Sequence, residues 1–258
     1  MKTNYGNWIS TPMMKTLVAI AAVLYVLTTL YAFIYDRVTA PFFILAILSG
    51  IATLVVLYMY YCRYVFSFEG GGLMRRIHGY LLDHLPWDGL GNALEVGCGS
   101  GALSISAAKR FPLAEVQGID YWPPMWNYGQ PQCEANAAAE GVAERCTFAH
   151  GDAAKLDFPD NHFDAVVSNF VFHEVRTQKD KFLLVEESLR VLKKGGAFAL
   201  HDTFGNRDMY GNMDEFVAYL QEKGIADVSY LPNTERIIEM PAPVRFMMRG
   251  IGMLYGTK

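Results

Sequence analysis

Two long apolar stretches stand near the start of the chain, and neither contains a charged residue. They cover residues 16–35 and 41–62, and each reaches the roughly 20 residues that a helix needs to cross a bilayer. The five residues between them allow only a tight loop, so the pattern predicts a transmembrane helical hairpin. Two alternatives fit less well. Core helices of soluble domains carry a polar stripe, and a cleaved signal peptide would account for the first stretch alone.

Basic residues flank the predicted hairpin on its outer side. They are Lys2 and Lys15 before it and Arg63, Arg75 and Arg76 after it, whereas Arg37 in the loop is offset by Asp36. The positive-inside rule therefore predicts a multi-pass membrane protein with both termini and the domain that follows the hairpin in the cytoplasm. We divide the chain into a membrane anchor, residues 1–68, and a cytosolic domain, residues 69–258. Small residues within the hairpin would also permit close packing into a homo-oligomer.

The remainder alternates short β-like runs with segments that suit helices. The predicted strands are residues 93–96, 115–119, 147–150, 163–169 and 197–201, and the predicted helices are residues 73–85, 102–110, 126–140, 179–192 and 214–223. This alternation predicts an α/β fold with a doubly wound, mainly parallel sheet that binds ligands at the carboxyl ends of its strands. Residues 240–255 are expected to supply the last strand, with contact to lipid headgroups as the alternative.

Composition excludes several classes of partner. The formal net charge is −4, so the chain lacks the basic field that binding to a nucleic-acid backbone requires. Its four cysteines show no C-x-x-C pair, and neither a metal site nor a disulfide framework is predicted. The 52% of hydrophobic residues is high for a soluble protein and agrees with a membrane anchor.

A glycine-rich turn follows the first predicted strand. Residues 94–101 read Leu-Glu-Val-Gly-Cys-Gly-Ser-Gly and lead into an apolar helix. Glycine lacks the Cβ that blocks close approach to a ligand, and the amides of a helix N-terminus favour an anionic group. The spacing also fits a dinucleotide fold, so this turn alone does not separate a nicotinamide cofactor from S-adenosylmethionine. Asp120, which ends the next strand and suits ribose hydroxyls, is likewise common to both.

The order of four segments narrows the choice between these two cofactors. Residues 94–101, 118–120, 151–169 and 191–196 together resemble the class I S-adenosylmethionine-dependent methyltransferases of the small-molecule and lipid type, and the resemblance covers about residues 69–202. It implies a seven-stranded Rossmann-like sheet and S-adenosylmethionine as the cofactor. A nicotinamide-dependent enzyme does not need the pattern of residues 151–169, so this segment favours S-adenosylmethionine as the cofactor.

The resemblance also implies a role for individual residues. Glu95, Gly97, Gly99 and Gly101 would surround the amino-acid end of the cofactor, Asp120 would hold its ribose, and Tyr121 or Trp122 would cover its adenine. Asp152 would meet the adenine amino group with Ala153 beside it, and Asn169 would lie near the methionine moiety and the reacting methyl group.

Methyl transfer from a sulfonium needs positioning more than acid–base help. If the acceptor must lose a proton, His173 after the fourth strand is the first candidate base and His201 the second. Residues 168–171 read Ser-Asn-Phe-Val, which departs from the Asn/Asp-Pro-Pro-aromatic motif of many amino-group methyltransferases of nucleic acids and proteins. We therefore expect transfer to a small-molecule or lipid-like acceptor at the membrane. A sensor or scaffold that binds the cofactor without turnover, or a hairpin that serves only oligomerisation, are the alternatives.

Overall fold

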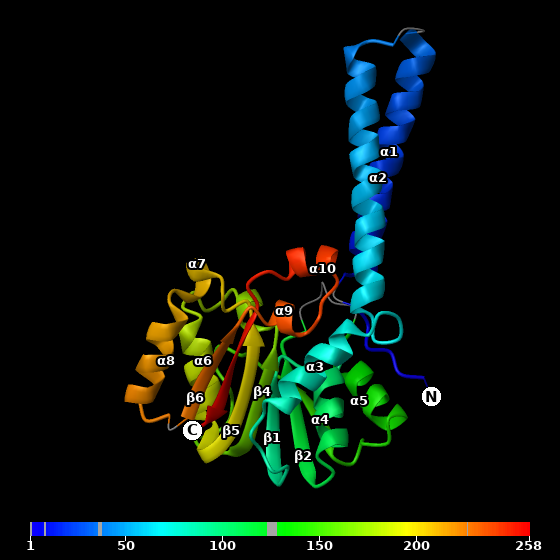
Figure 1. The fold of residues 1–258 in the computed structure, drawn as a ribbon. Helices are drawn as coiled ribbons and strands as arrows, with labels where there is room; N and C mark the ends of the chain where they lie inside the picture. Colours follow the sequence, from blue (N-terminus) through cyan, green and yellow to red (C-terminus); the bar gives the residue numbers. More distant parts are fainter. Residues whose placement is uncertain (1, 8, 36–37, 123–127, 226) are drawn as a thin grey trace. The chain divides into compact units, whose positions relative to one another are not determined.

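The chain forms two compact units. Figure 1 shows the computed structural model, which describes residues 2–7, 9–35, 38–122, 128–225 and 227–258. Residues 6–73 make up one unit, and residues 1–5 together with 74–258 make up the other. Asp36 and Arg37 of the predicted loop, and the first two residues of the predicted helix 126–140, lie outside the described residues.

The first unit is a pair of long helices. Helix α1 spans Thr11–Tyr35 and helix α2 spans Ala40–Phe66, so both extend beyond the apolar stretches seen in the sequence. Each is long and apolar enough to cross a membrane, and only 6% of the most apolar window of each is buried. Where the helices meet, the hydroxyl oxygens of Thr28 and Ser49 lie 3.1 Å apart. Such pairing satisfies polar groups that an apolar environment would leave unpaired.

The residues that enter and leave this helical pair are hydrogen-bonded to each other. The Asn7 side-chain amide donates to the carbonyl oxygen of Arg63 at 2.8 Å. The Arg63 guanidinium in turn donates to the carbonyl of Ile9 and to the Thr11 hydroxyl, the latter at 3.2 Å. The two chain segments at this end of the pair therefore lie side by side.

The second unit contains a seven-stranded sheet in the order β3-β2-β1-β4-β5-β7-β6. Its strands are β1 Gly91–Val96, β2 Ala114–Asp120, β3 Cys146–His150, β4 Phe163–Asn169, β5 Leu192–Asp202, β6 Asp227–Pro232 and β7 Gly252–Thr257. Strands β1 to β5 pair in parallel, and β7 runs antiparallel to both β5 and β6. The carboxyl ends of β1 to β6 therefore share one edge of the sheet, which confirms the predicted doubly wound α/β fold.

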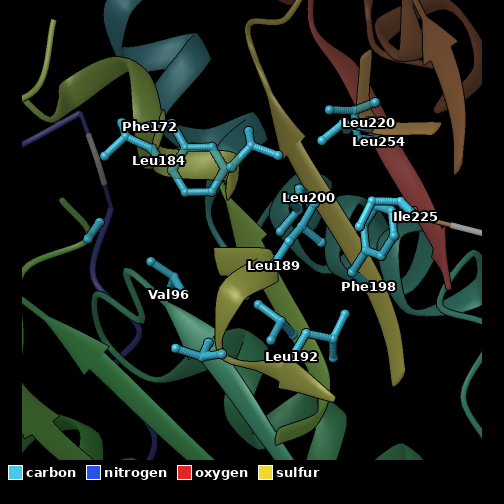
Figure 2. Packing of buried hydrophobic residues seen from close by; sticks show 14 of the residues in the cluster. Val96, Phe172, Leu184, Leu189, Leu192, Phe198, Leu200, Leu220, Ile225 and Leu254 are labelled. Carbon is cyan, nitrogen blue, oxygen red and sulfur yellow. The ribbon is translucent and has the colours of Figure 1, made fainter. Parts of the chain in front are cut away.

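Helices cover both faces of this sheet (Figure 1). They are α3 Leu73–Asp83, α4 Ala102–Arg110, α5 Gln130–Ala139, α6 Phe182–Arg190 and α8 Met213–Glu222, with the short helices α7 Arg207–Tyr210, α9 Thr234–Ile237 and α10 Ala242–Met247. Helices α6 and α8 contribute to one cluster of buried apolar side chains, and α3, α4 and α5 contribute to a second. In Figure 2, Leu200 of β5 lies near Leu189 of α6, and Phe198 of β5 lies near Ile225, all within the first cluster. Burial of each such side chain contributes roughly 1.5–3 kcal/mol.

The five predicted strands are all present, although β5 begins at Leu192, where the predicted helix 179–192 was expected to end, and α5 begins only at Gln130. The other differences concern the C-terminal part. Strand β6 was not predicted, because its six residues end in Pro232 and form no sustained apolar run. Residues 240–255 supply the last part of the sheet only from Gly252 onward, since α10 occupies the preceding segment. The expectation of a strand there is therefore confirmed only for the end of the segment.

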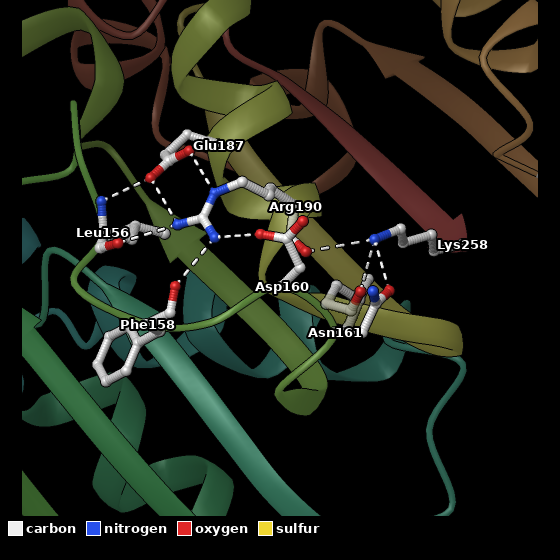
Figure 3. Close-up of polar contacts among 8 residues, drawn as sticks. Leu156, Phe158, Asp160, Asn161, Glu187, Arg190 and Lys258 are labelled. Atoms are coloured by element: carbon white, nitrogen blue, oxygen red, sulfur yellow. Dashed lines mark hydrogen bonds and ion pairs between the residues drawn. The ribbon is translucent and has the colours of Figure 1, made fainter.

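A network of ion pairs and hydrogen bonds around Arg190 stabilises one corner of the sheet (Figure 3). The Arg190 guanidinium, at the end of α6, forms an ion pair with Glu187 at 2.8 Å and another with Asp160 at 2.6 Å. It also donates to the carbonyl oxygens of Leu156 and Phe158, both at 2.9 Å. One planar side chain thus fixes the loop before β4 against α6.

Candidate functional site

The glycine-rich turn lies between β1 and α4. Gly97, Gly99 and Gly101 have φ values of +78°, +55° and +79°, in the left-handed region that side chains with a Cβ disfavour. The amides of Gly97 and Cys98 both donate to the carbonyl oxygen of Ile119 on β2, at 2.8 and 2.9 Å. A Cβ on Gly97 would lie 2.1 Å from Cγ2 of Val171. Glycine is therefore required here both by the backbone and by the close approach of the chain after β4.

Glu95 lies beneath this turn. Its side chain is 3% exposed, and its carboxylate accepts hydrogen bonds from the amide of Ser104, at 2.6 Å, and from the Ser104 hydroxyl. Burial raises the pKa of Glu95 to about 8, and the nearby charge of Asp120 adds to the rise. Glu95 fixes the start of α4 under the turn, so it supports the turn from below and offers little surface to a ligand.

Asp120 links the ends of β1 and β2. Its carboxylate accepts hydrogen bonds from the amide of Gly99 at 2.8 Å and from the amide of Trp122 at 2.7 Å. Burial raises the pKa of Asp120, although these amides oppose the rise. The indole Nε1 of Trp122 donates to the carbonyl oxygen of Gly99 at 2.7 Å, whereas Tyr121 is 59% exposed. Of the two aromatic residues predicted beside the adenine, Trp122 packs onto the glycine turn and Tyr121 faces outward.

Two residues that the sequence did not single out also contact this turn. The ring of Tyr128 would lie 3.6 Å from a Cβ on Gly99. Burial raises the pKa of its hydroxyl, and the carboxylates of Asp120 and Glu174 add to the rise. The Ser100 hydroxyl donates to the carbonyl oxygen of Tyr5 at 2.8 Å.

The N-terminal residues thus belong to the site. The buried amide of Asn136 on α5 accepts from the backbone of Asn4 at 2.8 Å and donates back to the carbonyl of Asn4 at 2.9 Å. It also donates to the carbonyl of Ser100 at 3.0 Å. We name Asn4 and Tyr5 the N-terminal strap. The pairing spans more than a hundred residues of sequence, so no local pattern predicts it.

Asp152 and Ala153 follow β3. The Asp152 carboxylate accepts from the amide of Ala154 at 2.8 Å and so forms a tight turn. Ala153 is 9% exposed and packs in the core cluster. The Gly151 amide donates to the carbonyl of Asp120 at 3.0 Å, which holds this turn beside the end of β2.

A buried polar network joins four elements at the carboxyl edge of the sheet. The imidazole of His201 on β5 is bonded to Asn169 on β4 at 3.1 Å and to the Thr234 hydroxyl on α9 at 2.7 Å. The amide of Asn169 lies 3.5 Å from Nε2 of His78 on α3. Burial lowers the pKa of His201 to about 4 and that of His78 to about 3. Both rings are neutral at physiological pH, and His201, with both nitrogens engaged, is a weak candidate for a base.

His173 lies in a different environment. It belongs to a short 3-10 helix, Phe172–Glu174, and its side chain is 20% exposed. Its Nδ1 is 2.7 Å from Oδ1 of Asp202, a carboxylate that is 1% exposed at the end of β5. Asp202 also accepts from the amides of Phe172 and Thr203, at 2.8 and 2.6 Å.

His173 and Asp202 shift each other's pKa in opposite directions. Burial alone would lower the pKa of His173, but the hydrogen bond and charge of Asp202 outweigh it, and the pKa of His173 is raised. Burial alone would raise the pKa of Asp202, but His173 and the backbone amides lower it. Asp202 therefore orients the imidazole through Nδ1, and the opposite nitrogen, Nε2, lies 3.6 Å from Oε1 of Glu174. The sequence analysis missed Asp202, whose signal was an acid at the end of a buried strand.

The parallel strands bring the predicted residues to one edge of the sheet. The turns after β1, β2 and β3 meet through Asp120, and Val171 after β4 contacts the glycine turn. His173 and Asp202 lie in the segments after β4 and β5. The glycine turn and the His173–Asp202 pair therefore both belong to the turns that follow the strands at this edge.

Comparison with known proteins gives partial matches within this unit. Residues 94–200 match the model of a family described as "Methyltransferase domain". A demethylmenaquinone methyltransferase from Roseiflexus castenholzii is 26% identical over 171 residues, which cover 63% of this chain and 67% of that protein. One from Staphylococcus aureus is 38% identical over 112 residues, or 43% of this chain and 42% of that protein. The match thus spans less than half the length of the staphylococcal relative.

Solved structures show the same fold. The complex between the Haloferax volcanii Trm112 methyltransferase activator and a putative methyltransferase has a matching chain with a TM-score of 0.52 and 20% identity, covering 72% of this chain and 92% of that one. Haemonchus contortus phosphoethanolamine N-methyltransferase 2 in complex with S-adenosyl-L-methionine also has a TM-score of 0.52, with 18% identity, covering 73% of this chain and 53% of that one.

Proposed function

We propose, from the premise that its α/β unit belongs to the class I S-adenosylmethionine-dependent methyltransferases, that this chain methylates a hydroxylated, quinol-type ring at a membrane. The observation that carries the cofactor assignment is the glycine turn joined to Asp120. The acceptor class is supported by the similarity to demethylmenaquinone methyltransferases and by two helices of membrane-spanning length.

The described residues fit the cofactor. Gly97, Gly99 and Gly101 leave the backbone of the turn free of Cβ atoms, as close approach of the amino-acid end requires. The Asp120 carboxylate has acceptor capacity beyond its two amide donors and would take the ribose hydroxyls. In this proposal Tyr121 or Trp122 covers the adenine. Glu95 acts by holding the turn, since it is buried against Ser104.

Further residues complete the proposed cofactor site. Asp152 would meet the adenine amino group, with Ala153 beside it. Asn169 would lie near the methionine moiety, where its amide is already oriented by His201 and His78. The bound cofactor would supply a methyl group carried on a sulfonium sulfur. After the transfer, the rest of the cofactor leaves as a neutral thioether.

The acceptor has to lose a proton if it is a phenolic ring. In our proposal, Nε2 of His173 takes the proton of a ring hydroxyl as the adjacent ring carbon attacks the methyl group. The proton on that carbon is then released to solvent, and the imidazolium returns its proton to the ring oxygen, which restores the aromatic ring and its hydroxyl. Asp202 stabilises the imidazolium that forms, because its buried carboxylate is 2.7 Å from Nδ1. The reduced, hydroxyl-bearing ring is the nucleophile in this scheme, so an oxidised quinone is not a substrate.

The two helices would bring this chemistry to a lipid-soluble acceptor. We infer that α1 and α2 span the membrane and that the α/β unit lies in the cytoplasm, on the side of Lys15, Arg63, Arg75 and Arg76.

Two titrations test the cofactor assignment. The purified full-length chain should bind S-adenosylhomocysteine in a calorimeter and should not bind NAD. Asp120→Ala should lose that binding, whereas Asp157→Ala, at an exposed acid without a proposed role, should keep it. Tight NAD binding without S-adenosylhomocysteine binding would overturn the family premise as applied to this chain.

A turnover assay then tests the acceptor class. Labelled methyl transfer to a short-chain demethylmenaquinol should occur under reducing conditions and stop when the ring is oxidised. His173→Ala should abolish turnover and retain S-adenosylhomocysteine binding. Binding without any turnover on phenolic rings would favour a non-catalytic sensor or scaffold.

A further inference from the structure

The connection between β6 and β7 lies at the carboxyl edge of the sheet. It contains α9 and α10, and Figure 1 shows both short helices at that edge. Thr234 anchors the connection, since its hydroxyl is 2.7 Å from His201 and its amide donates to the carbonyl of Ile251 at 3.1 Å. The two ends of the segment are therefore bonded to each other, and the first end is bonded to β5 through His201.

An open cleft of about 430 Å³ lies on this segment. Its lining residues, which we name the arginine cleft, are Glu235, Arg236, Ala242, Arg245, Phe246 and Arg249. The three arginine side chains belong to exposed residues, and within the described part of the chain no carboxylate forms an ion pair with any of them. The cleft thus carries a local positive charge in a chain whose formal net charge is −4, which favours an anionic ligand.

Glu235 adds a second polar feature. The residue is 2% exposed, and among the described residues its Oε2 has no hydrogen-bond partner. A buried carboxylate oxygen without a partner costs free energy, so a ligand that presents a hydrogen-bond donor would satisfy it. Guanidinium groups beside one carboxylate match a phosphate that is linked to a donor group such as a hydroxyl.

Apolar side chains adjoin the arginines. Phe246 in the cleft is 79% exposed, and its neighbour Met247 on α10 is 38% exposed. Ile237, next to Arg236 on α9, is 51% exposed. Large apolar side chains interleaved with arginines are typical of segments that insert at the boundary between lipid headgroups and acyl chains. A free phosphate in water would leave this apolar surface exposed.

We propose that the arginine cleft binds the headgroup of an anionic glycerophospholipid, with the arginines on the phosphate, Glu235 on a headgroup hydroxyl, and Phe246 among the acyl chains. This contact is a second attachment to the membrane, separate from the helical pair. It goes beyond the proposed methyl transfer, and it holds whatever the acceptor proves to be.

The test compares lipids around the full-length chain. The chain is placed in nanodiscs of phosphatidylcholine alone or with phosphatidylglycerol added, and hydrogen exchange is followed in peptides covering residues 234–249. We expect slower exchange only when phosphatidylglycerol is present. In detergent, a short-chain phosphatidylglycerol should bind more tightly than inorganic phosphate or a short-chain phosphatidylcholine.

Charge variants locate the binding. Arg245→Gln with Arg249→Gln should weaken binding of short-chain phosphatidylglycerol by about 25-fold, since each basic residue near an anionic surface contributes about 1 kcal/mol. Lys194→Gln with Lys223→Gln makes the same change in charge at exposed residues near the opposite edge of the sheet and should have little effect. Unchanged S-adenosylhomocysteine affinity in both double variants shows that the cofactor site is intact.

Three results would overturn the proposal. They are equal hydrogen exchange in the two kinds of nanodisc, equal loss of lipid affinity in the two double variants, and binding of inorganic phosphate as tight as that of the lipid. The last result would make the cleft a site for free phosphate. Failure of S-adenosylhomocysteine binding in the unaltered chain would count against the proposed function alone.

Discussion

Adding one methyl group to Gly97 should damage the glycine turn more than the same change at a matched glycine. Gly97 has φ +78° and a Cβ there would lie 2.1 and 2.6 Å from the two methyl carbons of Val171. Gly141 has φ +73°, and a Cβ there would meet nothing within 4 Å. The pair separates backbone strain from steric overlap.

The magnitudes follow from these contacts. Holding a residue with a Cβ in the left-handed region costs about 1–2 kcal/mol of stability. Replacing glycine by alanine recovers about 0.4–1 kcal/mol, because the unfolded chain has less conformational entropy. Gly141→Ala should therefore lower the free energy of unfolding by about 1 kcal/mol. Overpacking adds about 1–3 kcal/mol, so Gly97→Ala should lower it by roughly 2–4 kcal/mol.

Thermal unfolding of the purified chain measures this difference. At roughly 2–4 °C for each kcal/mol in a domain of this size, Gly97→Ala should melt several degrees below Gly141→Ala. It should also weaken S-adenosylhomocysteine binding, whereas Gly141→Ala should not. In a Val171→Ala background the two shortest contacts vanish, so the additional cost of Gly97→Ala should fall by about half. Equal melting temperatures for the two glycine variants, or no coupling to Val171, would refute the reasoning.

Three further predictions concern titration and anchoring. As a base, His173 has to be unprotonated, so kcat/KM should rise with pH through a pKa above the ordinary histidine value of 6.5. Asp202→Asn should move this rising part of the pH profile to lower pH. If the profile does not move, His173 is not the titrating group. Because the pKa of Glu95 is raised from 4.5 to about 8, the folded chain holds a proton that the unfolded chain releases, and stability should decline as pH rises across that window. Glu95→Gln should remove this part of the decline, as melting temperatures at the two ends of the window would show. Arg190→Lys should cost about 2 kcal/mol because an ammonium does not reproduce the planar set of donors, and an unchanged melting temperature would contradict the anchoring role.

The fold was largely predictable because strands and helices here depend on local patterns. The buried runs at β1, β2, β4 and β5 and the glycine turn at Gly97 are visible as short apolar segments followed by small residues. Strand β6 escaped prediction because an edge strand with a terminal proline carries a weak pattern.

The site was predictable where a residue sits directly at a strand end. Asp120, the last residue of β2, follows that rule, whereas His173 lies four residues beyond the end of β4. Asp202, the last residue of β5, carries the same signal, but its contact with His173 becomes visible only in the structure. Tyr128 depends on contacts made by the three-dimensional fold, which no spacing in the sequence reveals.

The N-terminal strap changes how a soluble form of this protein should be made. Because Asn4 and Tyr5 belong to the α/β unit, the helical pair is an insertion into that unit rather than a leader ahead of it. Truncation at residue 62 would remove the two hydrogen bonds between Asn4 and the buried Asn136 amide, and it would remove the Tyr5 carbonyl that accepts from Ser100 in the glycine turn.

Removing α1 and α2 while keeping the first residues is the better way to make a soluble form. Asn7 and Arg63 bond to each other where the chain enters and leaves the helical pair, so a short linker can replace α1 and α2 while the first residues are retained. Loss of cofactor affinity in an N-terminal truncation would then report a damaged turn, and it would say nothing about a requirement for lipid.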